Sequence, residues 1–419
     1  TNCAAESTEK ASPQAAAAQS GTVTYPVTGG NIYFDPSTGT VTGCGSSVTE
    51  AIIPSTINGV EVKSIGYRAF RSCKMLIGVT IPNSVTSIGD EAFCNCISLT
   101  SVEIPNSVTS TGNWAFENCK SLTSVIIPNS VMSIDCASFR DCESLTSVVI
   151  PNSVTIIDGF AFEGCTNLTS VTIPNSVSSI GMNAFRNCSK LTSMTIPNSV
   201  TSIGNGAFDW CTSLTSINVA DDNSDYSSED GVLFNKERTT LIKYPPRKID
   251  TQYVIPSSVT SINTYAFQSC VSLEDVTIPS SMNAISYYAF SDCTSLISVT
   301  IPNSVTNIDT SAFSDCTSLT SVIIPNSVTL INSYAFKNCT NLTSVTILKS
   351  NMRIYYSVFS GCDSLTDVYY SGSEAQWEQM SISSYNEPLL NAKIHFNHVI
   401  ANYTSIYDSD TGTLNLTTY

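Results

Sequence analysis

A phenylalanine followed three residues later by a cysteine recurs twelve times along this 419-residue chain. Successive pairs are 23 residues apart, except for one gap of 59 residues. A constant period of this length is typical of a solenoid, in which each repeat forms one turn that stacks on the next. Such a protein presents a long surface, which favours binding over catalysis. The phenylalanines are Phe70, Phe93, Phe116, Phe139, Phe162, Phe185, Phe208, Phe267, Phe290, Phe313, Phe336 and Phe359, and the cysteines run from Cys73 to Cys362.

The repeat SLTSVEIPNSVTSTGNWAFENCK shows how one turn is expected to form. Val102 and Ile104 alternate with polar residues, which is the period of a half-buried strand. Pro105 has no backbone N–H and is expected to end this strand. A second short extended segment follows, and then a helical turn that directs Ala115 and Phe116 into the core. One repeat cannot offset the entropy of ordering its residues, so neighbouring turns must stack to fold.

Sixteen cysteines raise the question of disulfides, but twelve of them occupy the same repeat position. We expect these twelve to form a reduced ladder of small buried side chains, because the parallel Cβ vectors of stacked turns suit a disulfide poorly. Zinc is not expected, since no C-x-x-C pair supplies converging ligands. The cysteines outside the ladder are Cys3, Cys44, Cys94 and Cys136.

The unit L-x-x-V-x-I-P-x-S-V-x-x-I, followed by A-F-x-x-C, closely resembles the bacterial BspA-like, or treponemal-type, leucine-rich repeat. The resemblance covers about residues 52–365, with twelve copies in register. It implies an α/β solenoid, a right-handed superhelix of 23-residue leucine-rich repeats with the strands on its inner face. It also implies a surface-exposed or secreted bacterial protein of the kind linked to adhesion and host-protein binding.

The two ends of the solenoid are expected to differ from its middle, because an open solenoid exposes its core and its strand edges. The N-terminal end reads as short strands joined by turns. At the C-terminal end, Ser373 and Gln376 have the spacing of a helix capping box. The predicted organisation is a flexible leader at 1–20, a β-rich N-terminal cap at 21–51, the solenoid at 52–365, an α+β C-terminal cap at 366–399 and a tail at 400–419.

An atypical repeat at 220–255 accounts for the long gap. Two extended segments joined by five residues predict a β-hairpin there. The segment is acidic in its first part and basic in its second, so the charges could pair with each other or contact a partner. The spacing of Asp221, Asn223 and Asp225 partly resembles a calcium loop, but Tyr226 stands where that loop needs glycine.

No feature of the chain predicts catalysis, a cofactor or a metal. His395 and His398 are the only histidines and lie outside the repeats, so no Ser–His or Cys–His pair is expected. The net charge is −16 with only 18 basic residues, which argues against nucleic acid as a partner. No apolar run is long enough for a transmembrane helix.

Aromatic residues collect around the position that precedes the Ala-Phe pair. We predict that they form a ridge that contacts a partner, and the alternative is that the rings pack on the adjacent turn. Interfaces concentrate their energy in tyrosine, tryptophan and arginine. The candidate partner-binding residues are Trp114, Phe160, Tyr265, Tyr287, Tyr288, Tyr334, Tyr355 and Tyr356.

The predicted function is non-enzymatic recognition or adhesion at the cell surface or outside the cell. The expected partner is a host or matrix protein or a glycan, bound by a monomer through the repeat surface. The alternative is a structural or self-associating surface component. Cys3 precedes a polar small-residue segment, as in a lipidated bacterial lipoprotein, and otherwise is an ordinary thiol. A lipid anchor at Cys3 is the one contact with a membrane that we predict.

Overall fold

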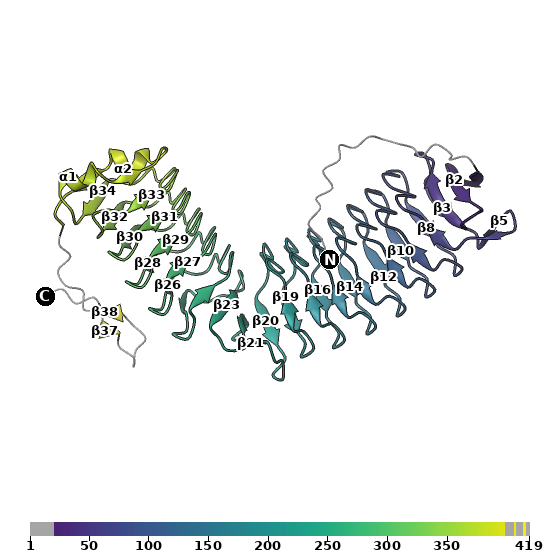
Figure 1. Ribbon diagram of the computed structural model, residues 1–419, viewed down its shortest axis with the longest axis horizontal. Helices are drawn as coiled ribbons and strands as arrows, with labels where there is room; N and C mark the ends of the chain where they lie inside the picture. The colour runs from purple at the N-terminus through teal and green to yellow at the C-terminus, as the bar shows by residue number, and fades with distance from the viewer. Residues whose placement is uncertain (1–20, 399–405, 408–413, 416–419) are drawn as a thin grey trace. The chain divides into compact units, whose positions relative to one another are not determined.

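A computed structural model of the protein describes residues 21–398 and two further short strands, β37 (Ile406–Tyr407) and β38 (Leu414–Asn415). The predicted leader, its Cys3 and most of the predicted tail lie outside the described residues. The chain consists of two structural units (Figure 1). The first consists of Thr1–Ile249 and Ile262–Cys270, and the second of Asp250–Ser261 and Val271–Tyr419. Each unit is a stack of turns built on parallel strands.

In most turns the first strand pairs in parallel with the equivalent strand of the next turn. The register joins identical repeat positions, so Ser101 lies opposite Ser124 and Val102 opposite Val125. In the first unit these strands are β4 (Glu50–Ile52), β8 (Gly78–Thr80), β10 (Ser101–Glu103), β12 (Ser124–Ile126), β14 (Ser147–Val149), β16 (Ser170–Thr172), β18 (Ser193–Ile196) and β20 (Ser216–Val219). In the second they are β24 (Gln252–Val254), β26 (Asp275–Thr277), β28 (Ser298–Thr300), β30 (Ser321–Ile324), β32 (Ser344–Ile347), β34 (Asp367–Tyr370) and β36 (Lys393–His395).

A second, two-residue strand follows the proline of each turn and forms its own parallel ladder. In the first unit these strands are β7 (Ser64–Ile65), β9 (Ser87–Ile88), β11 (Ser110–Thr111), β13 (Ser133–Ile134), β15 (Ile156–Ile157), β17 (Ser179–Ile180) and β19 (Ser202–Ile203). In the second they are β27 (Ala284–Ile285), β29 (Asn307–Ile308), β31 (Leu330–Ile331), β33 (Arg353–Ile354) and β35 (Ser381–Ile382). The strand β25 (Ser261–Ile262) lies where the two units divide the chain.

The helical turn predicted before each cysteine is absent from the described repeats, and a series of tight turns replaces it. Trp114 and Asn118, which flank the Ala-Phe pair of their repeat, have left-handed backbone with φ of 54° and 57°. The Phe116 N–H donates to the Ser138 carbonyl oxygen of the next turn at 2.8 Å. A helix cannot form here because these amide groups bond between turns rather than within one.

Stacked phenylalanine rings form the centre of each unit. Ring centroids lie 5.0 Å apart between Phe70 and Phe93 and 6.1 Å apart between Phe185 and Phe208. The second unit continues the pattern, with 5.2 Å between Phe290 and Phe313. These rings are buried, as the sequence predicts. Each turn is thereby held by the equivalent residue of its neighbours.

The cysteine ladder runs beside the phenylalanines, and its thiols donate hydrogen bonds to the backbone. The Cys142 Sγ lies 3.3 Å from the Phe116 carbonyl oxygen, and the Cys188 Sγ lies 3.2 Å from that of Phe162. Cysteine therefore supplies both a small apolar body and a donor for a carbonyl group in the core. The ladder is a structural element, with one thiol per turn.

The prediction of a fully reduced ladder is wrong at its first position, because Cys73 forms a disulfide with Cys44. Cys44 ends β3 in the N-terminal cap, so the bond crosses from cap to solenoid rather than running along the ladder. Cys136, which lies outside the ladder, is also disulfide-bonded. The other ladder cysteines are buried thiols that form no disulfide. The Cys44–Cys73 disulfide thus forms where a cysteine of the cap approaches the first ladder cysteine from outside the stack.

Burial makes the ladder thiols hard to ionise, which predicts an alkaline loss of stability. Burial raises the pKa of Cys119, Cys165 and Cys188 well above the usual 9.0. Above about pH 9 the unfolded chain loses thiol protons that the folded chain retains. The free energy of unfolding should therefore fall with rising pH, by about 1.4 kcal/mol per pH unit for each such thiol. Below about pH 9 these thiols should not make the free energy of unfolding depend on pH.

Urea unfolding at about pH 8 and about pH 10 measures this slope. The variant carrying Cys119→Ala, Cys165→Ala and Cys188→Ala is the control, because it loses three of the titrating groups while other alkaline ionisations remain. Its stability should depend less steeply on pH than that of the wild type. An equal slope in the two proteins would show that the thiols do not carry the effect.

The N-terminal cap is an antiparallel sheet of β1 (Val23–Val27), β2 (Gly30–Asp35) and β3 (Thr40–Cys44). β3 pairs in parallel with β7, which joins the cap to the second-strand ladder. The five extra residues of the first repeat form a small hairpin of β5 (Thr56–Ile57) and β6 (Val60–Glu61). Its turn residues Asn58 and Gly59 both have positive φ, of 52° and 80°.

The C-terminal cap contains the two helices of the described chain, α1 (Glu374–Trp377) and α2 (Glu387–Asn391). The predicted capping box is present, with Ser373 and Gln376 each bonding the other's backbone. The first-strand sheet extends into this cap, because β36 pairs in parallel with β34. Asn386 is fully buried and closes the core, accepting the Phe359 N–H at 3.1 Å.

The atypical repeat contains three antiparallel strands, β21 (Tyr226–Glu229), β22 (Val232–Asn235) and β23 (Thr240–Lys243). Its charges pair with each other in part, with Arg238 2.9 Å from Glu229. Asn223 is fully buried and bonds the Pro197 and Val200 carbonyl oxygens. Its side chain is therefore committed to the fold and is not part of a calcium loop.

Candidate binding surfaces

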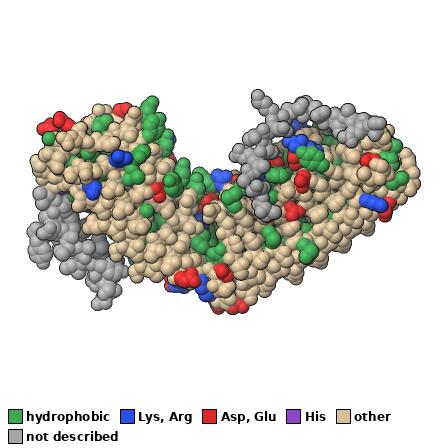
Figure 2. All heavy atoms as spheres, viewed as in Figure 1, with side chains coloured by type: hydrophobic (Ala, Val, Ile, Leu, Met, Phe, Trp, Pro, Cys, Tyr) green, Lys and Arg blue, Asp and Glu red, His purple; other side chains and the backbone are tan. Residues whose placement is uncertain are grey.

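The hydroxyl groups that dominate the surface are largely structural. The Thr123 hydroxyl donates to the Thr100 carbonyl oxygen at 3.1 Å, and Thr343 repeats this bond to Thr320 in the second unit. Serines do the same near the prolines, as Ser153 does to the Val131 carbonyl oxygen at 2.6 Å. On the face shown in Figure 2, charged side chains are few and scattered. Exposed aromatic, aliphatic and unpaired charged residues are therefore the features that could recognise a partner.

The left-handed position before each Ala-Phe pair carries most of the aromatic residues predicted to bind a partner. A positive φ is most easily adopted by glycine and asparagine, which occupy this position as Gly206 and Asn183. Bulky residues with positive φ are unusual and store backbone strain. The aromatic residues with positive φ at this position are Trp114, Phe160, Tyr265, Tyr288 and Tyr334, and Tyr385 has a positive φ in a turn without the Ala-Phe pair.

In the first unit the predicted residues Trp114, Phe160 and Tyr265 are half-buried. The Arg140 guanidinium lies 5.8 Å from the Phe160 ring centroid. The ring of Tyr265 lies 6.4 Å from that of Trp210. These aromatic side chains thus pack in part on neighbouring turns.

In the second unit three tyrosines from successive turns form a cluster: Tyr334, Tyr356 and Tyr385. The Tyr334 and Tyr356 ring centroids lie 5.6 Å apart, and those of Tyr356 and Tyr385 lie 4.8 Å apart, both edge to face. Lys337 Nζ lies 5.5 Å from the Tyr334 ring centroid. Partial burial and the neighbouring Tyr385 and Tyr334 raise the pKa of Tyr356, so its hydroxyl stays protonated. We call these three residues the tyrosine cluster.

The remaining predicted residues, Tyr287, Tyr288 and Tyr355, also lie in the second unit but do not belong to the tyrosine cluster. Tyr287 and Tyr355 are exposed, whereas Tyr288 is half-buried. Tyr385 belongs to the cluster but is missing from the predicted set, because its turn lacks the Ala-Phe pair. The sequence gives little indication of Tyr385, because it follows Ser357 by five residues more than the repeat spacing of 23.

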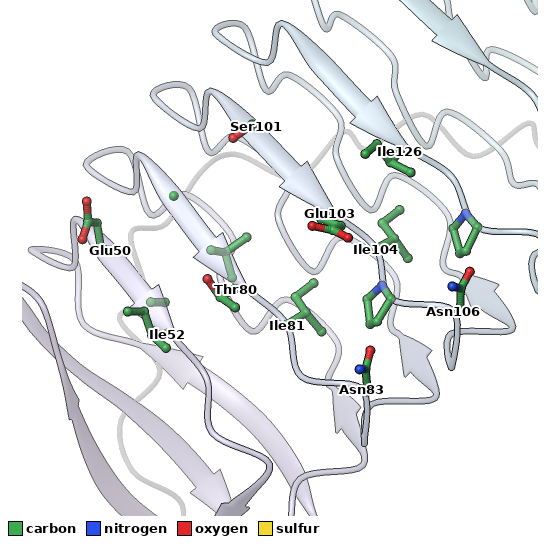
Figure 3. A pocket seen from close by; sticks show the side chains of 15 residues that line it. Glu50, Ile52, Thr80, Ile81, Asn83, Ser101, Glu103, Ile104, Asn106 and Ile126 are labelled. Carbon is green, nitrogen blue, oxygen red and sulfur yellow. The ribbon is translucent and has the colours of Figure 1, made fainter.

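A groove lies on the strand face of the first unit, where β4, β8, β10 and β12 follow one another (Figure 3). Its volume is about 740 Å³. Glu50 and Ile52 reach it from β4, Glu103 from β10 and Ile126 from β12. Sequence analysis did not single out this region, because Glu50, Glu103 and Ile126 belong to different repeats.

Alternating charges form a second feature that sequence analysis missed. The residue after each core phenylalanine stacks on its equivalent, which places Arg140 2.9 Å from Glu163 and Arg186 2.9 Å from the same carboxylate. Arg71 is likewise 2.8 Å from Glu91. These groups neutralise one another along the edge of the turns, so they do not present a charged patch.

The two histidines lie in the C-terminal cap, against strand β34. His395 Nε2 lies 2.7 Å from Asp367 Oδ1, a hydrogen bond that lowers the pKa of Asp367 together with the Thr366 hydroxyl. The rings of His395 and His398 both pack on Tyr369. Between residues 21 and 398 no group of three potential metal ligands converges. No helix in this described part is long and apolar enough to cross a membrane.

In-register parallel strands, one short turn per repeat and a stacked apolar core define a leucine-rich repeat solenoid. The family model for the BspA type leucine rich repeat region matches residues 43–147, 132–246 and 248–366. These ranges cover more than half of the chain, and the protein belongs to the BspA-type leucine-rich repeat family. The resemblance inferred from the repeat is thereby confirmed.

Solved structures with this fold include bacterial proteins of similar length. A leucine rich cell surface protein from Faecalibacterium prausnitzii is 35% identical, with a TM-score of 0.77 over 86% of this chain and 98% of that one. A leucine-rich repeat protein from Bacteroides ovatus is 25% identical, with a TM-score of 0.57 over 91% and 99%. The pneumococcal vaccine antigen PcpA, 22% identical with a TM-score of 0.60 over 91% and 97%, shares the fold. No curated protein matches the chain.

Proposed function

We propose that this protein is a non-enzymatic recognition protein of the cell surface or extracellular space. Its partner is a host or matrix protein or a glycan, bound through the repeat surface. Membership of the BspA-type family supports this proposal, as does the similarity to a cell surface protein from F. prausnitzii. A lipid anchor at Cys3 would hold the protein at the surface.

The observation that carries the proposal is the tyrosine cluster. Tyr334 and Tyr385 have φ of 64°, a backbone conformation that asparagine adopts at Asn183. The repeat geometry imposes this left-handed backbone in many turns, as at Ser311 and Ser357, and a bulky side chain there costs on the order of 1 kcal/mol. Tyrosine is also a residue in which interfaces concentrate binding energy, and its ring and hydroxyl suit both protein and sugar surfaces. A fold-only role would be served better by asparagine.

The test compares stability with binding. The variant carrying Tyr334→Asn, Tyr356→Ser and Tyr385→Asn should keep or gain stability, because asparagine relieves the strain at the two left-handed positions. Its affinity for the partner should fall by about tenfold or more, the loss expected from removing one or two interface hot spots. Binding is measured against an immobilised panel of extracellular matrix proteins and glycans, and stability by urea unfolding.

Tyr67→Ser is the matched control, because Tyr67 is 59% exposed and lies in the first unit, outside the cluster. It should bind the panel as the wild type does. Equal binding by the cluster variant and the wild type would refute the role of the cluster. Failure of the intact protein to bind any member of the panel would contradict the proposed function.

A further inference from the structure

The groove across β4, β8, β10 and β12 contains a row of outward-facing residues. Strand register places Ile52, Thr80, Glu103 and Ile126 at the same position of four successive turns. Ile52 and Ile126 are 66% and 64% exposed, which is unusual for isoleucine. The row therefore offers an apolar side chain on each side of a carboxylate.

The carboxylates of the groove are unpaired. Neither Glu50 nor Glu103 has an ion pair or a side-chain hydrogen bond among the described residues. Glu91, Glu143 and Glu163, which lie on the turns, are all paired with a lysine or arginine. The groove lining contains no basic residue, so its negative charge is not neutralised within the site.

We propose that this groove binds an extended peptide segment in which basic and aliphatic residues lie two positions apart, so that both kinds of side chain face the sheet. The basic side chain pairs with Glu103, and aliphatic side chains cover Ile52 and Ile126. Glu50, two residues before Ile52 on β4, accepts a second basic side chain. The volume of about 740 Å³ lies in the range of ligand sites and accommodates several side chains.

The chemistry of the groove argues against other occupants. It contains no aromatic side chain on which a sugar ring could stack. Its two carboxylates come from strands separated by β8 in the sheet, so they do not converge as metal ligands do. A segment that carries both positive charge and aliphatic surface satisfies both features of the groove.

The test uses a fluorescein-labelled peptide, capped at both ends, in which valine and lysine alternate at every second position with serine between them, and binding is measured by fluorescence anisotropy on the full chain. Glu103→Gln should weaken binding by about fivefold, the effect of one exposed ion pair. Ile126→Ser should also weaken it. Two reference peptides, one with serine in place of valine and one with glutamine in place of lysine, should bind less tightly than the valine–lysine peptide.

Glu274→Gln is the matched control, because Glu274 is an exposed carboxylate immediately before strand β26 of the second unit. It should leave the affinity unchanged. An equal loss with Glu274→Gln would overturn the proposal, since it would show general attraction to an acidic protein. Equal binding of either reference peptide would also overturn it. The tyrosine-cluster variant should bind the peptide normally, so this proposal and the proposed function can fail separately.

Discussion

Replacing Phe162 with alanine is expected to destabilise the first unit by about 3–5 kcal/mol, the usual cost of removing a buried aromatic ring. Phe162 is fully buried, with ring centroids 5.6 Å from Phe139 and 5.5 Å from Phe185. Both stacking contacts are lost at once. The rigid backbone ladders on both sides limit how far the cavity can close, so the cost should lie in the upper part of this range.

Urea unfolding measures the loss, and hydrogen exchange locates it. Because each turn contacts only its neighbours, exchange should accelerate most in the turns around Phe139, Phe162 and Phe185. Val149→Ala is the control: this residue is 78% exposed, so its replacement should change stability by less than about 1 kcal/mol. A loss below about 1 kcal/mol for Phe162→Ala would show that the stack is not a main source of stability.

Removing Asp209 is expected to cost about 3–5 kcal/mol, because it leaves the Lys243 charge buried without its partner. The two side chains are only 9% and 3% exposed, and Lys243 Nζ lies 3.4 Å from Asp209 Oδ1. Lys243 also donates to the Tyr265 carbonyl oxygen at 2.7 Å. Burial raises the pKa of Asp209, and Lys243 opposes that shift. The Lys243 ammonium group therefore stabilises the charged form of the Asp209 carboxylate.

The double variant with Asp209→Leu and Lys243→Met distinguishes the cost of leaving one buried charge unpaired from the cost of losing side-chain volume. It should be within about 1 kcal/mol of the wild type or more stable, because apolar residues of similar size avoid the cost of burying two charges. Asp209→Ala and the double variant are compared by urea unfolding. Equal destabilisation of the two would show that packing, and not an unpaired charge, accounts for the effect.

Much of the fold follows from the repeat, because each core position recurs at a fixed interval. The strands, the phenylalanine stack and the buried thiols were all predictable from one turn. The tight turns were harder to predict: their second left-handed position often carries asparagine, aspartate or glycine, as at Asn118, but their first carries residues such as Trp114 and Phe160, which do not usually indicate positive φ. The Ala-Phe pair alone looks equally suitable for a helix.

Two core residues of the atypical repeat, Tyr244 and Lys243, were not predicted from the sequence. Tyr244 is fully buried and its ring stacks at 5.1 Å on Phe267, so it takes the place of a phenylalanine. The spacing of 23 residues between Tyr244 and Phe267 was a usable signal. Lys243 then occupies the alanine position, which could not be expected because lysine is rarely buried unless paired. Its partner Asp209 is 34 residues away in sequence.

The candidate sites were predictable only in part. The aromatic positions could be named from their composition, but the contact among Tyr334, Tyr356 and Tyr385 required the structure of the C-terminal cap. The groove was missed for a different reason. Glu103 and Ile126 belong to different repeats, 23 residues apart in the sequence, and only the strand register shows that they are neighbours.

The in-register pairing of identical positions also bears on how such a gene can change. The strand that begins at Ser124 pairs with the strand that begins at Ser147, which in turn pairs with the strand that begins at Ser170. Joining Ser124 directly to the segment that follows Ser170 would therefore remove two whole turns and keep every type of contact between turns. Recombination between equivalent codons of near-identical repeats can therefore shorten or lengthen the protein without a new core having to evolve. Selection can then act on length and on the few variable surface residues, while the fold stays the same.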